Sequence, residues 1–340
     1  MAEQAFLWIT EADVVSLMDM GEAIEALTDG LRLEGHSQAQ NLAKTHTAWD
    51  QGSTLHALGA VFPQAGFAGT KTWCHTEGGA TPLLMLFDSR TGALKAIIEA
   101  FALGQLRTGA ASGVATRWLA SPDANEFAII GTGKQAIAQV AAMLAVRPIR
   151  HVRVFGRDEG RRAGCAERIA ADYGVRASAY STVREAIEQA AIITVVTRAQ
   201  VPIVSGDMVA RGTHINAIGA ITPDRIELSQ DVLARASRIV VDSVPQVRRL
   251  SRELIELLGD DSDQWARVEP LAQIVARQAG RASSDDLTVF KAMGMGISDL
   301  SLGIRLYALA RERHLGWVYP HPQRVPPRFG FPAVGRGVER

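Results

Sequence analysis

The feature that most constrains this chain is a glycine-rich turn joining an apolar strand to an apolar helix. Residues 126–130 (EFAII) have a strand-forming pattern, and residues 137–146 are apolar and helix-forming. Between them lies the turn Gly131-Thr132-Gly133-Lys134-Gln135-Ala136. The pattern G-x-G-x-x-A in this context is typical of dinucleotide sites: the first glycine allows the turn, the second admits the pyrophosphate, and the alanine allows close packing. The alternative is a glycine turn without a ligand.

Short Val- and Ile-rich runs continue to alternate with helical stretches after this turn. They occupy residues 151–155, 191–196, 214–219 and 238–243. This alternation predicts a parallel sheet covered on both faces, that is, a Rossmann-type doubly wound α/β domain. The strand pattern ends around Pro245. Beyond it we expect a charged helical region, and within residues 285–310 a helix that returns to the first domain.

The first 120 residues follow a different pattern, which predicts a second, α+β domain. Thr10 and Asp13 are spaced as a helix start, and residues 101–120 form a helix rich in small residues. Strands are expected at residues 6–9, 55–61, 69–75, 83–87 and 93–99. Residues 316–340 contain five prolines, so we expect neither a helix nor a central strand there. We expect an extended arm on a surface or a partner subunit, with disorder as the alternative.

Composition narrows the functional classes. The 36 basic and 36 acidic residues balance, which disfavours nucleic acid and a polybasic membrane surface as partners. Two distant cysteines, Cys74 and Cys165, give neither a disulfide framework nor a metal motif, so no metal is expected. The N-terminus lacks signal-peptide features, and no apolar run is long enough to span a membrane. We therefore expect a cytoplasmic protein.

The second strand of the predicted Rossmann domain carries the signal for the type of cofactor. Residues 151–155 are followed by Gly156-Arg157-Asp158. A guanidinium at this position suits the 2′-phosphate of NADP, whereas an acidic side chain suits the 2′-hydroxyl of NAD. We favour NADP(H) on the basis of Arg157, with Asp158 as the argument for NAD(H). The ends of later strands should border the nicotinamide, and the candidates are Thr197, Ala217 and Gly219.

Several segments together resemble the ornithine cyclodeaminase / mu-crystallin family. They are residues 71–100, 103–120, 129–136, 214–228 and 285–300, in this order. The resemblance implies a homodimer of NAD(P)-dependent enzymes that exchange hydride with a carbon bearing an amine or imine. It also implies a substrate-binding and dimerisation domain (1–120 plus about 300–325) and a Rossmann domain (121–299). The prolines, rather than the resemblance, predict the extended tail (326–340).

The resemblance assigns a carboxylate-binding pair to Lys71 and Arg107. Two fixed cations near a nicotinamide would hold an amino-acid carboxylate. An exposed strand lysine and a structural ion pair are the alternatives. The family's third cation is an arginine, and Lys44 is its nearest substitute here. Asp299 matches a family position near the nicotinamide; a helix cap or an ion pair is its alternative.

One departure from the family pattern bears on the reaction. Where ornithine cyclodeaminases have an aspartate, this chain has Ile221, which is neither a base nor a ligand for an ammonium group. The hypothesis is therefore an NAD(P)H-dependent imine reductase or amino-acid dehydrogenase. The alternatives are a cyclodeaminase-type lyase and a non-catalytic NADPH-binding protein. His75 is a candidate proton donor, although a histidine with only a structural hydrogen bond is the commoner case.

Overall fold

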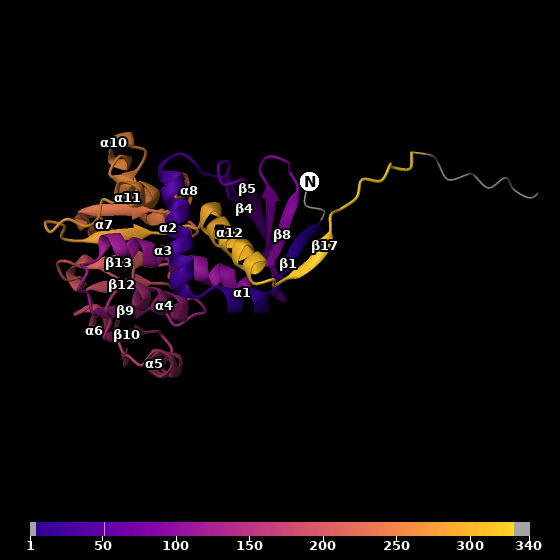
Figure 1. Cartoon of the computed structure of the whole chain (residues 1–340). Helices are drawn as coiled ribbons and strands as arrows, with labels where there is room; N and C mark the ends of the chain where they lie inside the picture. Colours follow the sequence, from indigo (N-terminus) through magenta and orange to yellow (C-terminus); the bar gives the residue numbers. More distant parts are fainter. Residues whose placement is uncertain (1–4, 51, 330–340) are drawn as a thin grey trace, which may run out of the picture.

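The described part of the chain forms two β-sheets and the helices that cover and join them. The computed structural model describes residues 5–50 and 52–329. One sheet is mixed and is built from the two ends of the described chain; the other is all parallel and is built from its middle. Figure 1 shows the sheets at opposite sides of the molecule, with α2, α3 and α12 between them. The prediction of a Rossmann-type α/β fold with a second α+β domain is confirmed.

The mixed sheet follows the order β17-β1-β8-β7-β5-β4-β2, with β3 paired to β4 and β6 to β5. All its pairs are antiparallel except β1 with β8. Its strands are β1 (Ala5–Ile9), β2 (Gln40–Asn41), β3 (Thr45–Trp49), β4 (Ser53–Phe62), β5 (Phe67–Thr76), β6 (Gly79–Ala80), β7 (Leu83–Asp88), β8 (Leu94–Glu99) and β17 (Trp317–Pro320).

The parallel sheet follows the order β11-β10-β9-β12-β13-β16-β14-β15. Its chain order reverses direction at β9, as in a doubly wound domain. Its strands are β9 (Glu126–Ile130), β10 (His151–Phe155), β11 (Arg176–Tyr180), β12 (Ile192–Val195), β13 (His214–Ala217), β14 (Arg238–Val241), β15 (Val268–Pro270) and β16 (Thr288–Lys291).

The helices cover these sheets and join them. They are α1 (Glu11–Leu17), α2 (Met20–Gly35), α3 (Phe101–Leu119), α4 (Ala136–Val146), α5 (Glu159–Tyr173), α6 (Val183–Ile187), η1 (Gly206–Met208), α7 (Gln230–Arg235), α8 (Val244–Leu250), α9 (Arg252–Leu258), α10 (Ser262–Trp265), α11 (Leu271–Arg277) and α12 (Gly296–Glu312). The predicted capping box of Thr10 and Asp13 starts α1. Helix α12 packs on α2, α3 and β4, so the end of the chain returns to its beginning.

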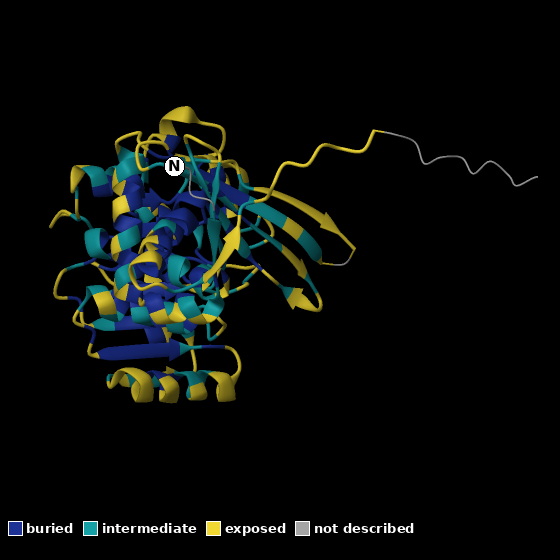
Figure 2. Ribbon diagram, turned by 45° about the vertical axis from the view of Figure 1, so that its right-hand side comes forward, coloured by how far each residue is buried: buried dark blue, intermediate teal, exposed yellow. Residues whose placement is uncertain are grey.

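Alternate residues of β9 show why the parallel sheet is covered on both faces. Phe127 and Ile129 join a core with α3, α4 and α5, whereas Ala128 and Ile130 join a second core with α6, α7 and α9. The small residues of α3 allow close approach on the first face. A Cβ at Gly109 would lie 2.7 Å from the Ala138 carbonyl oxygen of α4. In Figure 2 the parallel strands are buried, whereas the projecting strands of the mixed sheet carry many exposed residues.

The expectation that the sheet pattern ends near Pro245 is wrong. Two further strands, β15 and β16, complete the sheet, and β16 lies between β13 and β14. Strand β16 is only four residues long and ends in Lys291, which is 2% exposed because it pairs with Glu253 of α9. A strand at residues 45–49 was also not expected; β3 is exposed along its whole length and lacks an apolar pattern.

The segment after α12 forms an edge strand and then an extended arm. Strand β17 pairs antiparallel with β1, and residues 321–329 have no secondary structure and run away from the body in Figure 1. The rest of the predicted 326–340 tail lies outside the described residues. The domain boundaries remain a proposal. Among the described residues, no helix has the length and apolar character needed to cross a bilayer.

A fully buried histidine connects the parallel sheet to α3 and predicts a pH dependence of stability. His214 contacts Thr288 Oγ1 at 2.9 Å and Asn216 Oδ1 at 3.1 Å, and Asn216 donates to Thr116 Oγ1 of α3 at 3.0 Å. Burial lowers the pKa of His214 from 6.5 to about 3. Below pH 6.5 the unfolded chain therefore binds a proton that the folded chain does not. As the pH falls below about 6, the free energy of unfolding should therefore decrease by about 1.4 kcal/mol per pH unit because of His214.

Urea unfolding of the wild type and of His214→Gln between pH 6.5 and 4.5 measures this contribution. The variant should start less stable, because Gln cannot reproduce both contacts, but it should lose less stability as the pH falls. Parallel pH profiles for the two proteins would contradict the assignment.

Candidate functional site

The centre of the candidate site is a buried ion pair between the two sheets. Lys71 of β5 donates to Asp299 Oδ1 of α12 at 2.6 Å, and both side chains are almost fully buried. The Lys71 ammonium lies 3.4 Å from the Cβ position of Gly104 on α3 and 5.2 Å from the centre of the Trp73 ring. Burial lowers the pKa of Lys71, whereas Asp299 acts in the opposite direction. This lysine is therefore not an exposed strand residue.

Arg107 completes the centre from one turn further along α3. Its Nε lies 3.6 Å from Asp299 Oδ2, which is close enough for an ion pair but too far for a hydrogen bond. Within the described residues, Arg107 Nε and Asp299 Oδ2 are buried without a hydrogen-bond partner. The arginine side chain keeps 21% exposure. Two cations thus share one carboxylate, and the guanidinium retains donors for an anionic ligand.

Lys44, the predicted third cation, interacts electrostatically with this group; its role in binding substrate stays a prediction. Burial and the nearby Arg107 lower the pKa of Lys44, whereas Asp242 and Asp299 act in the opposite direction. Asp242 follows β14 and accepts hydrogen bonds from the backbone N–H groups of Met293 and Gly294 at 2.6–3.0 Å. Its position beside the cations was not foreseen, although an acidic residue at the end of a predicted strand was a visible signal.

Aromatic rings form a row beside Lys71. His46, His56 and Trp73 are opposite one another in β3, β4 and β5. The His46 and His56 rings lie 5.6 Å apart, and the His56 and Trp73 rings lie 4.7 Å apart, nearly parallel. Burial and the positive charge of Lys44 lower the pKa of His56 to about 4, so its ring is neutral at pH 7.

His75 lies away from this centre. It is exposed and four residues beyond Lys71 on the same face of β5, which is about 13 Å at the usual strand rise. Its catalytic role stays a prediction.

The cations face the carboxyl edge of the parallel sheet. The Arg107 guanidinium lies 3.1 Å from the Cβ position of Gly294, in the turn that follows β16. Asp242, at the end of the neighbouring strand, holds the same turn. Ligands of doubly wound domains bind at this edge, so the geometry fits a small acid held next to a dinucleotide.

The glycine-rich turn has the shape that a dinucleotide requires. Gly131 has φ +117°, and a Cβ on it would lie 2.6 Å from the Val196 carbonyl oxygen, so only glycine fits. A Cβ on Gly133 would meet no heavy atom within 4 Å. The backbone is therefore open where the pyrophosphate is expected, at the N-terminus of α4. Ala136 is buried against the core, as predicted.

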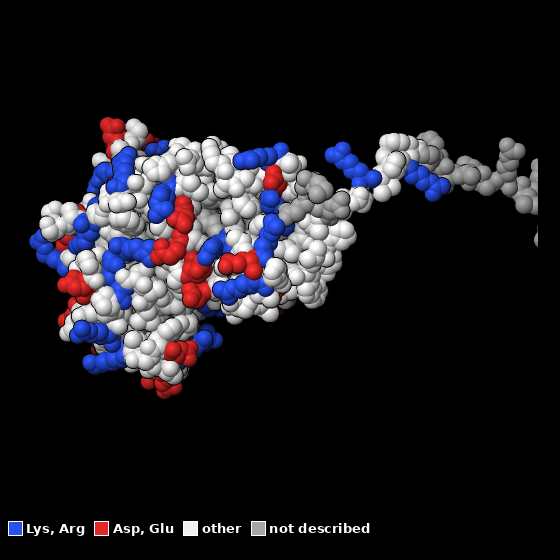
Figure 3. Space-filling view, in the orientation of Figure 1, with Lys and Arg blue, Asp and Glu red and all other residues white. Residues whose placement is uncertain are grey.

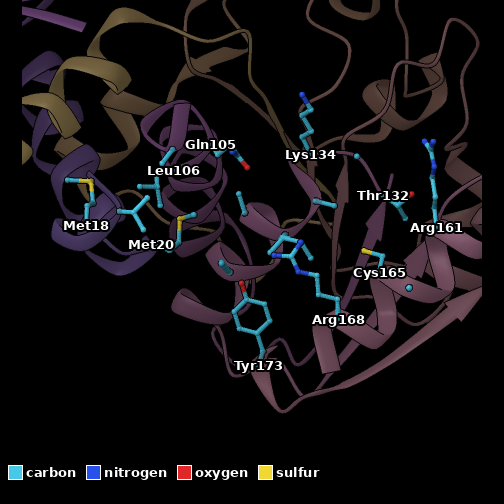
Figure 4. Close-up of a pocket in the computed structure, with 18 residues that line it drawn as sticks. Met18, Met20, Gln105, Leu106, Thr132, Lys134, Arg161, Cys165, Arg168 and Tyr173 are labelled. Carbon is cyan, nitrogen blue, oxygen red and sulfur yellow. The ribbon is translucent and has the colours of Figure 1, made fainter. Parts of the chain in front are cut away.

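A cavity of about 670 Å³ adjoins this turn. It is bordered by Thr132 and Lys134 of the turn and by Gln105 and Leu106, which directly precede Arg107. In Figure 4 the Gln105 and Lys134 side chains lie on the same side of the cavity. The start of α3 thus connects the cationic centre with the surroundings of the turn.

Arg157 and Asp158 have different environments. Arg157 is exposed. Asp158 is the N-cap of α5, and its Oδ1 accepts a hydrogen bond from the Arg161 N–H at 2.8 Å. One carboxylate oxygen of Asp158, the residue that would favour NAD, is therefore already occupied by the cap of α5.

Two of the residues predicted to border the nicotinamide, Thr197 and Gly219, donate to a carboxylate that the sequence did not single out. Glu227 is fully buried and accepts hydrogen bonds from Thr197 and Gly219. Ala217 is the last residue of β13 and is fully buried. Ile221 is half-buried and packs against the second core. The Thr197 and Gly219 donors are 30 and 8 residues away from Glu227 in the sequence, so no local spacing pointed to this carboxylate. Its position in a loop after a predicted strand was the one available signal.

One face of the molecule carries surface charge of both signs. On the face shown in Figure 3, acidic and basic side chains are interspersed over the body of the protein.

Comparisons with known proteins identify a family and similar folds. The profile described as "Ornithine cyclodeaminase/mu-crystallin family" matches residues 6–313. A Δ1-pyrroline-2-carboxylate reductase of Bacillus cereus is 36% identical over 271 residues, which cover 77% of this chain and 80% of the relative.

Two solved structures are also similar. The Δ1-pyrroline-2-carboxylate reductase of Thermococcus litoralis, in complex with NADH and L-proline, has a TM-score of 0.85 at 28% identity, covering 92% of this chain and 99% of that one. An archaeal alanine dehydrogenase dimer with bound NAD has a TM-score of 0.84 at 28% identity, covering 93% and 99%.

Proposed function

The chain belongs to the ornithine cyclodeaminase/mu-crystallin family, and from this premise we propose that it is an NAD(P)H-dependent oxidoreductase acting on C–N bonds. Its reaction is the reduction of the C=N bond of an imine derived from a 2-oxo acid, or its reverse, amino-acid dehydrogenation. The observation that carries the proposal is the cluster of Lys71, Arg107 and Asp299 at the carboxyl edge of a sheet with an open glycine turn. The similar reductase and dehydrogenase support it.

Lys71 and Arg107 are proposed to bind the substrate carboxylate, with Lys44 adding positive charge. Asp299 holds the two cations in place, so little side-chain entropy is lost when the acid binds. Arginine supplies the planar donor pair that a carboxylate accepts. Fixing the acid group directs the adjacent carbon towards the cofactor. When bound, a reduced nicotinamide supplies the hydride.

Lys71 Nζ is also the proposed proton source for the imine nitrogen. Burial lowers its pKa, which makes proton release easier, and Asp299 stabilises the protonated form between turnovers. The alternative donor, His75, is exposed and further along the strand.

For the cofactor we propose NADP(H) in preference to NAD(H). Arg157 is exposed beside the tip of β10, and the Asp158 side chain caps α5. The similar solved structures contain NADH or NAD, so the preference depends on this chain's own residues.

Arg157→Ala tests the preference. A lost charge-assisted hydrogen bond of about 1.5–3 kcal/mol corresponds to a roughly 10–150-fold weaker NADPH complex. NADH affinity should stay within about twofold, because that cofactor has no 2′-phosphate. Fluorescence titration of both cofactors measures the two constants. Equal changes for both, or no change, would reject Arg157 as the selector.

An assay at 340 nm tests the proposed reaction. The enzyme is mixed with NADPH or NADH and with Δ1-pyrroline-2-carboxylate, Δ1-piperideine-2-carboxylate, or 2-oxo acids plus ammonia or methylamine. We expect cofactor oxidation with at least one imine. Tight cofactor binding without oxidation in any mixture would favour a non-catalytic binding protein. Ammonia and proline from ornithine, without net cofactor turnover, would favour a cyclodeaminase, against which Ile221 argues.

We also propose a homodimer. The similar alanine dehydrogenase is a dimer, and Trp49 of β3 and Leu55 of β4 are 40% and 49% exposed here. Light scattering should give twice the chain mass of 36.5 kDa.

A further inference from the structure

We infer that Glu227 is a positioning residue that fixes the two strand ends bordering the nicotinamide half of the cofactor site. The inference rests on the proposed dinucleotide site. Glu227 Oε1 accepts from the Thr197 N–H at 2.6 Å and from Thr197 Oγ1 at 2.8 Å, after β12. Its Oε2 accepts from the N–H groups of Gly219 and Ala220 at 2.8 and 3.1 Å, after β13. Each oxygen thus serves one strand.

The two strand ends are packed too closely to move independently. A Cβ on Gly219 would lie 2.1 Å from the Thr197 carbonyl oxygen and 2.4 Å from Glu227 Oε1. The carboxylate, the Thr197 backbone and Gly219 therefore form one unit. The carboxyl ends of adjacent strands border the ligand in this fold. This unit therefore determines the shape of the cofactor site on the side formed by the ends of β12 and β13.

A second buried carboxylate holds Glu227 in turn. Glu253 Oε1 of α9 accepts from the N–H groups of Glu227 and Leu228 at 2.8 and 3.2 Å. Its Oε2 pairs with Lys291 Nζ of β16 at 2.6 Å, with both side chains 2% exposed. Burial raises the pKa of Glu227, whereas Lys291 acts in the opposite direction. A network of polar contacts from Lys291 through Glu253 to Glu227 thus connects the two strand ends to the interior of the sheet.

Burying two carboxylates with only one lysine costs desolvation free energy, so the network is not explained by a gain in folding stability. The network instead gives a defined geometry, because a carboxylate is the side chain that can accept four hydrogen bonds at once. A glutamine has one oxygen, so its amide N–H₂ would face the N–H groups of one strand end. Glu227→Gln should therefore release one strand end while leaving side-chain volume unchanged.

Titration with two ligands distinguishes a loss of positioning at the nicotinamide half of the site from a general loss of protein structure. ADP-ribose and its 2′-phosphate contain the half of the dinucleotide that should contact the glycine-rich turn, and they lack nicotinamide. For Glu227→Gln we expect NAD(P)H to bind at least about 10-fold more weakly, and the matching ADP-ribose to change less than about twofold. The control Glu188→Gln, at an exposed position after α6, should change neither.

Thr197→Val is the second variant, in case Glu227→Gln does not fold. It removes the Oγ1 donor to Glu227 and the acceptor of a long hydrogen bond from the Ala199 N–H (3.3 Å), and it keeps the backbone donor to Glu227. NAD(P)H should therefore bind about 3–5-fold more weakly, with ADP-ribose again unchanged. Equal weakening of both ligands, or no weakening of NAD(P)H, would overturn the inference. Failure of wild-type protein to bind NAD(P)H would instead reject the dinucleotide site itself.

Discussion

Replacing Arg107 by methionine is expected to lower kcat/KM for the imine by about 10²–10³-fold. Truncating one partner of a buried charged pair costs about 2–5 kcal/mol, and each 1.4 kcal/mol is a factor of ten. The carboxylate would then depend on Lys71 and Lys44 alone, and the reacting carbon would lose its fixed orientation. Steady-state kinetics over a range of imine concentrations measures the loss.

The same helix offers a matched control. Arg117 lies ten residues further along α3, and its side chain donates to Glu25 of α2 at 2.6 Å in a partly exposed pair. Arg117→Met should leave kcat/KM within about twofold, because exposed ion pairs contribute little. NAD(P)H affinity should be unchanged in both variants. A kcat/KM for Arg107→Met close to that of Arg117→Met would remove Arg107 from the carboxylate site.

Gly133→Val is expected to weaken NAD(P)H binding by at least about 100-fold while the protein stays folded. The Cβ position of Gly133 meets no heavy atom within 4 Å, and its φ is not in the left-handed region, so valine is accommodated in the free protein. The added methyl groups would occupy the space through which the pyrophosphate approaches the backbone. Calorimetric titration measures affinity, and thermal unfolding should give a Tm within about 2 °C of wild type.

Two further glycine variants make the result specific. Gly78→Val adds the same side chain in the turn between β5 and β6, where a Cβ would meet only Thr76 Oγ1 at an ordinary contact distance of 3.6 Å, and it should not change NAD(P)H affinity. Gly131→Ala places a Cβ against the Val196 carbonyl oxygen in a left-handed backbone, so it should destabilise the fold. Normal NAD(P)H binding by Gly133→Val would contradict the assignment of the turn as the pyrophosphate site.

Local patterns predicted much of the fold because they depend on neighbouring residues only. The glycine turn, the capping box of Thr10 and the alternating runs of the parallel sheet all belong to this class. Strand β16 was missed because its last residue, Lys291, looks like a surface residue until Glu253 is placed beside it. Strand β3 was missed because it is exposed and has no apolar alternation.

The candidate site could be predicted only in part, because its side chains meet through tertiary contacts rather than through local patterns. Lys71, Arg107 and Asp299 came from resemblance to a family. The contact between Lys71 and Asp299 joins residues 228 apart, which no local pattern encodes. Asp242 and Glu227 were passed over because their importance lies in backbone N–H groups of distant loops. Such partners become visible only when the strand ends are brought together.

A crystal structure of the enzyme with NADP⁺ and the amino-acid product would show how the acid group is held. The product carboxylate should lie within about 2.7–3.2 Å of both Lys71 Nζ and the Arg107 guanidinium. The α carbon should lie within about 3–3.5 Å of C4 of the nicotinamide. A carboxylate bound away from these two cations, or an α carbon turned away from the nicotinamide ring, would contradict the proposed site.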